Sequence, residues 1–308
     1  MTGGEVERSS APTVHQLRMF LTLAEELHFG RTAARLFMSQ PALSRQLGAL
    51  ERRLGVELIA RTSRSTALTP AGQALLPHAR TVVQAMRQLQ QVADDHTHGL
   101  GGRVVVGTVG AEAAMDHTTA VLSELRRLHP ALEVEIRLLN LVEQFQSLST
   151  GEVDVVFCRP PAPDDVRTHH LNTEPRVVCV SADDPLAGRG QVTLAELDGR
   201  TIVSFPSGCP RVWRDFWAAD PRPSGVAVRY GPVVSDLESL YAEVAHSGAI
   251  SLQPYAAKHL FPRPGVEFLD VTDLSPCSSA LAWHATAEHR PLITAIRQAA
   301  KNAWPRPT

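Results

Sequence analysis

The fold of the first part of this chain is decided by one segment of seventeen residues, Ser39-Gln40-Pro41-Ala42-Leu43-Ser44-Arg45-Gln46-Leu47-Gly48-Ala49-Leu50-Glu51-Arg52-Arg53-Leu54-Gly55. Leucines recur in it at spacings of three and four, which is typical of the buried face of a helix. Ser39 is a good N-cap, and Pro41 is tolerated because first-turn amides lack partners inside the helix. We therefore expect a helix over about 40–54.

Two shorter helices precede this segment, and a hairpin follows it. Apolar residues from Leu17 to Leu27 repeat with helical spacing, and a second short helix with small side chains is expected over 31–37. Because two short helices meet at a tight turn, we predict a helix-turn-helix over 29–48. The runs 57–61 and 65–68 predict two short strands, which would form a wing.

The start of the 40–54 helix has side chains suited to DNA. A recognition helix presents its N-terminal residues to base edges. Glutamine can pair with adenine and arginine with guanine, proline and alanine can touch a thymine methyl group, and serine can reach a phosphate. The residues concerned are Gln40, Pro41, Ala42, Ser44 and Arg45. An exposed arginine on a small helical bundle is also compatible with a merely solvated surface, so spacing alone leaves both interpretations open.

The charge distribution separates the chain into two parts. The 308 residues carry a net charge of −2, but residues 1–90 hold eleven arginines, no lysine and six glutamates, a net +5. The remaining residues therefore carry a net −7. The length fits about two domains. We find no signal-peptide pattern and no membrane-length apolar run, so we expect a cytoplasmic protein with no membrane partner. The four separated cysteines predict free thiols and no metal site.

A long helix should follow the hairpin. Its apolar residues alternate at spacings of four and three, the seam by which two helices pair. They are Leu75, Ala79, Val82, Met86 and Leu89. The same stripe could instead pack on the protein's own body. The following stretch, 94–102, contains aspartates, histidines and glycines; we interpret it as a hinge in preference to a metal site.

From Arg103 onward, short apolar strands alternate with helices. Strands are expected over 104–106, 133–139, 153–158, 177–180, 201–205, 226–230 and 249–252, and helices over 116–128, 142–148, 211–218 and 236–246. Such a series predicts mainly parallel sheets covered on both faces. Two series in about 200 residues suggest two lobes with a ligand crevice at the strand C-termini.

Residues 15–80 closely resemble the winged helix-turn-helix of LysR-type transcriptional regulators, through the 39–46 segment, Leu50-Glu51-x-x-Leu54-Gly55 and Leu68-Thr69-Pro70-Ala71-Gly72. The resemblance implies that the positions matching Gln40, Pro41, Ser44 and Arg45 contact bases or DNA, and that Arg53, Arg61 and Arg64 contact the backbone or minor groove. Arg31, Ser39 and Ala42 complete the expected DNA-binding set. The resemblance also favours dimerisation through the 75–89 stripe.

Residues 103–302 resemble the effector domain of the same family, which is similar to periplasmic binding proteins. We expect a winged helix-turn-helix over 13–72, a linker helix and hinge over 73–98, and an effector domain over 99–308. Lobe I would comprise about 103–174 and 273–302, and lobe II about 175–272. The chain should cross between the lobes near 172–175 and 269–273.

The resemblance places an effector cleft at named positions. They are Val109, Gly110, Ala111, Asn140, Leu141, Arg159, Phe205, Pro206, Ser207 and Gly208. Relatives that bind carboxylates often have serine or threonine where Ala111 and Leu141 stand, so carboxylate binding through hydroxyl groups is not expected here.

Two cleft side chains have alternative interpretations. Arg159 could pair with an acidic effector or with a carboxylate of the protein. Cys209 matches the reactive cysteine of peroxide-sensing relatives, but Ala218 stands where the resolving cysteine is expected, so we interpret Cys209 as a loop or cleft thiol.

The sequence thus predicts a transcription regulator that is not an enzyme. Its expected partners are double-stranded promoter DNA, a small-molecule effector, a second copy of itself in a dimer or tetramer, and RNA polymerase; no cofactor is expected. The alternatives are an enzyme, or a ligand-binding module with a vestigial DNA-binding part. No GxSxG, HExxH or P-loop motif supports the enzyme.

Overall fold

The computed structural model describes residues 11–61, 66–98 and 102–304. The chain forms two compact units that divide between Ala93 and Asp94. We call the first unit the head and the second the body, and each is described by itself.

The head consists of a three-helix bundle, a hairpin and a long helix. Its elements are α1 (Val14–Glu26), α2 (Phe29–Arg35), α3 (Gln40–Leu54), β1 (Ile59–Arg61), β2 (Thr66–Leu68) and most of α4 (Pro70–His98), of which residues 94–98 belong to the second unit. The predicted 40–54 helix is confirmed as α3. Its N-cap Ser39 accepts a hydrogen bond from the Ala42 amide, and Gly55 ends it with a left-handed φ of 72°.

The core of the head joins the three short helices to the start of α4. Phe20, Leu23, Leu43 and Leu50 are at most 1% exposed, and they pack with apolar residues of the hairpin and of α4. The helix-turn-helix and its wing therefore share one core.

A carboxylate and a glycine hold the hairpin in place. Glu51 Oε1 accepts hydrogen bonds from the amides of Leu58 (2.9 Å) and Ile59 (3.3 Å). A Cβ atom on Gly72 would lie 2.2 Å from the Leu58 carbonyl oxygen, so only glycine permits this approach of α4 to the hairpin. The strands are antiparallel, with Ile59 opposite Leu68.

The predicted hinge over 94–102 is wrong for residues 94–98, because α4 continues to His98. Before Gly99 the stretch contains neither glycine nor proline, so nothing in it forces the helix to stop. Residues 99–101 lie outside the described residues.

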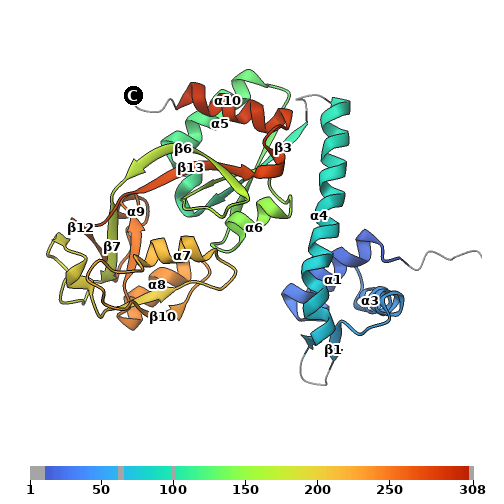
Figure 1. The fold of residues 1–308 in the computed structure, drawn as a ribbon, viewed down its shortest axis with the longest axis horizontal. Coiled ribbons are helices and arrows are strands. Elements are labelled where there is room, and N and C mark those ends of the chain that lie inside the picture. The colour runs from blue at the N-terminus through green and yellow to red at the C-terminus, as the bar shows by residue number, and fades with distance from the viewer. Residues whose placement is uncertain (1–10, 62–65, 99–101, 305–308) are drawn as a thin grey trace, which may run out of the picture. The chain divides into compact units, whose positions relative to one another are not determined.

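Lobe I of the body is a five-stranded sheet in the order β4-β3-β5-β13-β6. The strands are β3 (Arg103–Val109), β4 (Glu133–Leu139), β5 (Val155–Cys158), β6 (Val166–Glu174) and β13 (Cys277–His284), and the helices are α5 (Asp116–Leu128), α6 (Glu143–Ser149) and α10 (Pro291–Ala303). In Figure 1, α5 and α10 lie together against this sheet. All of β5 is buried. Val155 and Phe157 face the apolar cluster that contains α5 and α10, whereas Val156 and Cys158 face the cluster that contains α6.

Lobe II has a four-stranded sheet in the order β11-β7-β12-β8 and a parallel pair, β9 and β10. Its strands are β7 (Arg176–Ser181), β8 (Gln191–Val192), β9 (Thr201–Ser204), β10 (Arg229–Val233), β11 (Ser251–Pro254) and β12 (Val266–Val271). Its helices are α7 (Arg211–Ala218), α8 (Leu237–Ser247) and α9 (Ala257–Leu260). A parallel bridge between Ile202 and Ile250 connects the pair to the larger sheet.

The predicted two-lobed α/β architecture is confirmed, but the sheets are mixed. β13 runs antiparallel to β5 and β6, and β7 runs antiparallel to β11 and β12. The prediction of mainly parallel sheets missed β6, β12 and β13, the strands beside the crossings between lobes. The first crossing is at Pro175, and the second lies between Val271 and Cys277; it does not begin at Leu269, because that residue pairs with Val178 inside β12.

Candidate functional site

The exposed side of α3 carries the residues predicted to meet DNA. Gln40, Pro41 and Arg45 are exposed, whereas Leu43 and Leu47 on the opposite side are at most 3% exposed. Ala42 and Ser44 are partly buried, and Ser39 Oγ is engaged in capping the helix. The first turns of α3 therefore present donors and acceptors on a rigid support.

Gln16 connects α1 to the middle and to the last turn of α3, a role that the sequence did not reveal. Its side chain is 4% exposed. Gln16 Oε1 accepts a hydrogen bond from Arg53 Nη1 (2.5 Å), and Gln16 Nε2 donates to Gln46 Oε1 (3.3 Å). Arg53 is thus an exposed cation whose direction is set by a buried amide, which suits contact with a phosphate group.

The other predicted arginines differ in their surroundings. Arg31 is paired with Glu26 (3.2 Å) and donates to the Glu26 backbone oxygen (2.7 Å), so a phosphate group would compete with a carboxylate for it. Hydrogen bonds from Arg35 and then Arg31 hold the pKa of Glu26 below its usual value. The side chain of Arg61 and all of Arg64 lie outside the described residues.

The predicted pairing stripe of α4 divides into two halves. Val82 and Leu89 are 48% and 64% exposed, and Met86 is partly exposed. Ala79 is 5% exposed within the core of the head, and Leu75 packs against that core. For Leu75 and Ala79 the structure shows the alternative interpretation, packing on the protein itself, because the first turns of α4 complete the core of the head; their part in dimerisation stays a prediction.

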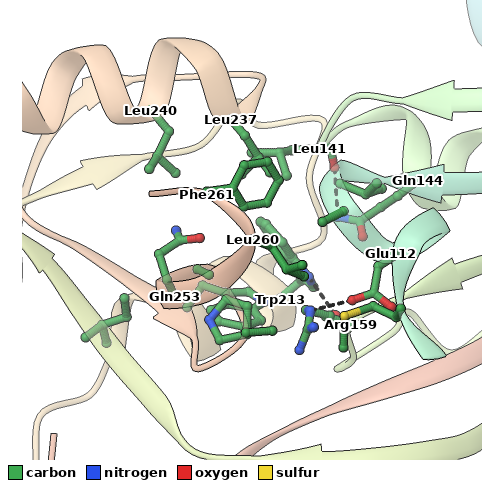
Figure 2. A pocket seen from close by; sticks show the side chains of 18 of the residues that line it. Glu112, Leu141, Gln144, Arg159, Trp213, Leu237, Leu240, Gln253, Leu260 and Phe261 are labelled. Atoms are coloured by element: carbon green, nitrogen blue, oxygen red, sulfur yellow. Dashed lines mark hydrogen bonds and ion pairs between the residues drawn. The ribbon is translucent and has the colours of Figure 1, made fainter. Parts of the chain in front are cut away.

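A cavity of about 80 Å³ lies in the body between residues of the two lobes. Lobe I contributes side chains from the end of β3 and from α6, and lobe II contributes side chains from α7, α8, β11 and α9. Figure 2 shows Gln144, Glu112 and Arg159 on one side and Leu240, Gln253 and Phe261 on the other. The wall thus follows the strand ends at which a ligand crevice is expected.

Five of the ten predicted effector residues line this cavity: Val109, Ala111, Leu141, Arg159 and Phe205. The other five, Gly110, Asn140, Pro206, Ser207 and Gly208, do not, and the structure shows other roles for three of them. Asn140 Oδ1 accepts hydrogen bonds from the amides of Val142 and Glu143 (both 2.9 Å), which stabilises the turn leading into α6. A Cβ atom on Gly110 or Gly208 would come within 2.8 Å of a side chain of the facing lobe, Leu237 or Val142.

Several large wall residues were not predicted from the sequence. They are Trp213, Trp217 and Phe261, together with Gln253 and Glu112. The spacing of four between the tryptophans places both on one side of a helix, which is a usable signal, but the helix pattern alone does not say which cavity that side meets.

Arg159 is paired inside the protein. Its Nε lies 2.7 Å from Glu112 Oε1, and its Nη1 lies 2.6 Å from Glu174 Oε1. Burial works to lower the pKa of Arg159, but the two carboxylates outweigh it and leave that pKa raised. Of the two interpretations of Arg159, the geometry supports the structural partner.

The two acids have further partners of their own. Glu112 Oε2 lies 3.2 Å from His117 Nε2, and Glu174 Oε2 accepts a hydrogen bond of 2.6 Å from the Ala256 amide. Trp213 Nε1 donates to the Arg159 carbonyl oxygen (3.0 Å). This network joins lobe I to lobe II beside the cavity.

Both units match models of one protein family. Residues 14–73 match the bacterial regulatory helix-turn-helix of the lysR family, and residues 97–305 match the LysR substrate binding domain. The chain belongs to the LysR family. It is a LysR-type DNA-binding transcriptional regulator with an effector-binding domain, and its family consists of transcriptional regulators.

Similar proteins agree with this assignment. YnfL of Escherichia coli is 36% identical over 193 residues, 62% of this chain and 65% of YnfL. AlsR of Bacillus subtilis is 32% identical over 66% of this chain and 68% of AlsR. TfdS of Cupriavidus pinatubonensis is 29% identical over 93% of this chain and 97% of TfdS. The crystal structure of CbnR has a TM-score of 0.61 at 23% identity and covers 95% of this chain and 99% of CbnR, which shows the shared fold.

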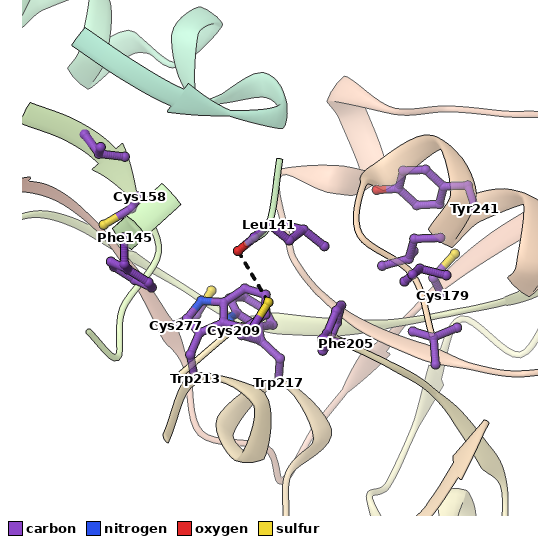
Figure 3. Close-up of a cluster of buried hydrophobic side chains, with 14 of the residues drawn as sticks. Leu141, Phe145, Cys158, Cys179, Phe205, Cys209, Trp213, Trp217, Tyr241 and Cys277 are labelled. Carbon is purple, nitrogen blue, oxygen red and sulfur yellow. Dashed lines mark hydrogen bonds between the residues drawn. The ribbon is translucent and has the colours of Figure 1, made fainter. Parts of the chain in front are cut away.

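The cysteines of this LysR-type regulator are buried and free. Cys209 Sγ lies 3.5 Å from the Leu141 carbonyl oxygen, beside Trp213 and Trp217 (Figure 3). Burial raises the pKa of Cys209 to about 11, and it also raises the pKa of Cys277 to about 11. A thiol must lose its proton to react quickly, so this environment opposes redox sensing at Cys209.

Neither a metal site nor a membrane helix is found in the described part of the chain. No group of histidine, cysteine, aspartate and glutamate there is arranged to hold a metal ion. No described helix has the length and apolar character needed to cross a bilayer.

Proposed function

We propose that this regulator binds an interrupted dyad in promoter DNA as a homodimer or a pair of dimers, and that a small molecule in the cavity of the body alters this binding. The observation that carries the proposal is α3, a capped helix whose buried side belongs to the core of the head and whose exposed first turns carry Gln40, Pro41 and Arg45.

The DNA contacts would divide into two kinds. Gln40 and Arg45 would pair with base edges in the major groove, since both side chains can make two hydrogen bonds to one base. Arg53 would bind a phosphate group and fix the orientation of the helix. The hairpin would place Arg61 and Arg64 at a minor groove.

Self-association would use the second half of α4. Val82, Met86 and Leu89 follow heptad spacing, and two of them are about half exposed or more. Burying such a stripe against the same stripe of a second copy removes apolar surface from water. A two-fold dimer presents two recognition helices, which matches a dyad of half-sites.

The effector would act by binding one arrangement of the lobes more tightly than another. The cavity wall is shared by both lobes, so occupation can change their relative positions. We further propose that the regulator works in the cytoplasm, contacts RNA polymerase at the promoter and has no catalytic activity.

Genomic fragment selection tests the proposal. The full chain is incubated with sheared DNA of the source organism at about 0.15 M salt, a concentration that suppresses nonspecific binding. Bound fragments are sequenced and then footprinted. We expect enriched promoter fragments protected at two half-sites separated by whole helical turns; binding that does not discriminate these fragments from random DNA overturns the proposal.

A further inference from the structure

The cavity wall is almost entirely apolar. Among the described residues that line it, the only polar side chains besides the tryptophan indoles are Glu112, Gln144, Arg159 and Gln253, and none is lysine, serine, threonine or histidine. Four aromatic side chains take up much of the wall, two of them the tryptophans of α7. A ligand placed here loses its water and meets hydrocarbon over most of its surface.

Arg159, the cation among the described residues of the wall, already pairs with two carboxylates. Arg159 is bound to Glu112 and Glu174 through two different nitrogens, and its side chain is 13% exposed. One guanidinium and two carboxylates carry a net charge of −1. An anion that approached the remaining Nη2 would face the two carboxylates at similar range, and burial weakens the screening between them.

The amide donors of the wall are also occupied. Gln144 Nε2 donates to the Leu141 carbonyl oxygen (3.0 Å), and Gln253 Nε2 donates to Ser251 Oγ (2.8 Å). In Figure 2 the oxygen of Gln253 is on the side of Leu260 and Phe261. The amide oxygens remain available as acceptors, so the wall suits a hydroxyl or N–H group of a ligand better than an anion.

One neutral donor of the wall, the indole N–H of Trp217, has no partner among the described residues and is itself buried. Trp217 is 5% exposed, and its Nε1 makes no hydrogen bond there. Because this nitrogen has almost no accessible surface, a ligand in the cavity as it stands does not reach it, so the N–H supplies no donor for a carboxylate or a carbonyl oxygen.

The size of the cavity limits the ligand. Its volume of about 80 Å³ is about half the roughly 150 Å³ of an engineered apolar cavity that takes up benzene. A branched molecule of a few carbons therefore has a size that suits the cavity as it stands.

We propose that the effector of this regulator is a small, uncharged, mainly apolar molecule with a hydroxyl or N–H group, and that the cavity excludes carboxylates. This inference rests on the proposed function, namely that the cavity is the effector site. It identifies Glu112 and Glu174 as the specificity-determining residues, since they hold Arg159 away from an acidic ligand.

Matched pairs of probes test the inference on the full chain. Isobutanol is compared with sodium isobutyrate, and benzyl alcohol with sodium benzoate, at equal concentration and with sodium chloride balancing ionic strength. Thermal unfolding is followed by tryptophan fluorescence, and a ligand that binds only the folded state raises Tm. We expect each alcohol to raise Tm in a concentration-dependent way and each carboxylate to match the sodium chloride control.

Variants of Glu112 and Glu174 test whether the cavity can be made to bind a carboxylate. Glu174→Gln and, separately, Glu112→Gln release one arm of Arg159, and we expect at least one folded variant to be stabilised by benzoate. Glu133→Gln is the matched control, because Glu133 is exposed on β4 outside the cavity wall; it should behave like the wild type. Circular dichroism confirms that each variant is folded.

The inference is overturned if benzoate raises the Tm of the wild type as much as benzyl alcohol does. It is also overturned if neither alcohol raises that Tm. Neither result affects DNA binding, which is measured separately by fragment selection. If the alcohols raise Tm but leave operator affinity unchanged, the ligand class stands and the regulatory role of the cavity fails.

Discussion

Replacing Glu51 with alanine will destabilise the head and leave the body unchanged. Glu51 Oε1 accepts the amides of Leu58 at 2.9 Å and Ile59 at 3.3 Å, and these residues are 0% and 5% exposed. Alanine leaves two buried amides without their charged acceptor. A hydrogen bond to a charged group contributes about 1.5–3 kcal/mol to stability, and the longer of the two bonds contributes less than the shorter one. Glu51 is only partly buried, so we expect the free energy of unfolding of the head to fall by about 2–3 kcal/mol.

The distribution of aromatic residues makes the two units separately measurable. All four tryptophans, at positions 213, 217, 283 and 304, lie in the body, and so do all three tyrosines. Tryptophan fluorescence in urea therefore reports the body alone, whereas far-ultraviolet circular dichroism reports the helices of both units. For Glu51→Ala we expect the circular dichroism transition of the head to move down by about 1–2 M urea.

Two variants serve as controls. Glu57→Ala removes an exposed acid of the same segment, so its effect should stay within about 0.5 kcal/mol. Glu51→Gln keeps an acceptor oxygen without the charge and should lie between alanine and the wild type. If Glu51→Ala unfolds like Glu57→Ala, or if the fluorescence transition shifts equally, the reasoning about this anchor is refuted.

Three further outcomes are expected from other parts of the chain. Leu89→Asp should shift the sedimentation of the protein towards the monomer while the exposed control Gln90→Asp does not, and an unchanged mass for Leu89→Asp would exclude the α4 stripe as the pairing surface. Cys209, with a pKa of about 11, has a thiolate fraction of about 10⁻⁴ at pH 7; it should react with a disulfide reagent only as the protein unfolds, and rapid labelling of the native protein would show that the burial argument fails. Arg53→Ala should lower the affinity for operator and for random DNA alike, and it should reduce the slope of log K against log salt by about 1 for each subunit. An unchanged slope would show that Arg53 does not contact a phosphate group.

Local signals explain what the sequence could predict. The bounds of α3 follow from the cap at Ser39, the leucine spacing and Gly55, all within seventeen residues. The predicted ranges of α5, β4 and α7 also agree with the structure, because periodicity and flanking turns act over short distances. The family resemblance then added the function to the fold.

Contacts between distant residues explain what the sequence could not predict. Arg159 meets Glu112, 47 positions earlier, and no pattern in the chain marks that pairing. Ala79 has heptad spacing, but its burial depends on how α4 meets the core of the head. The antiparallel strands β6, β12 and β13 gain their partners only when the chain crosses between lobes, so a series of local signals suggested parallel sheets instead.

The most direct test of the central claim is the affinity of the full chain for its selected operator, measured with wild type and Arg45→Ala on the native site, on single-base substitutions and on random duplex. If α3 reads bases, Arg45→Ala will cost about 1–3 kcal/mol on the operator and abolish discrimination at one base pair in each half-site, while random DNA is affected far less. An equal loss of affinity on operator and random DNA would contradict the account.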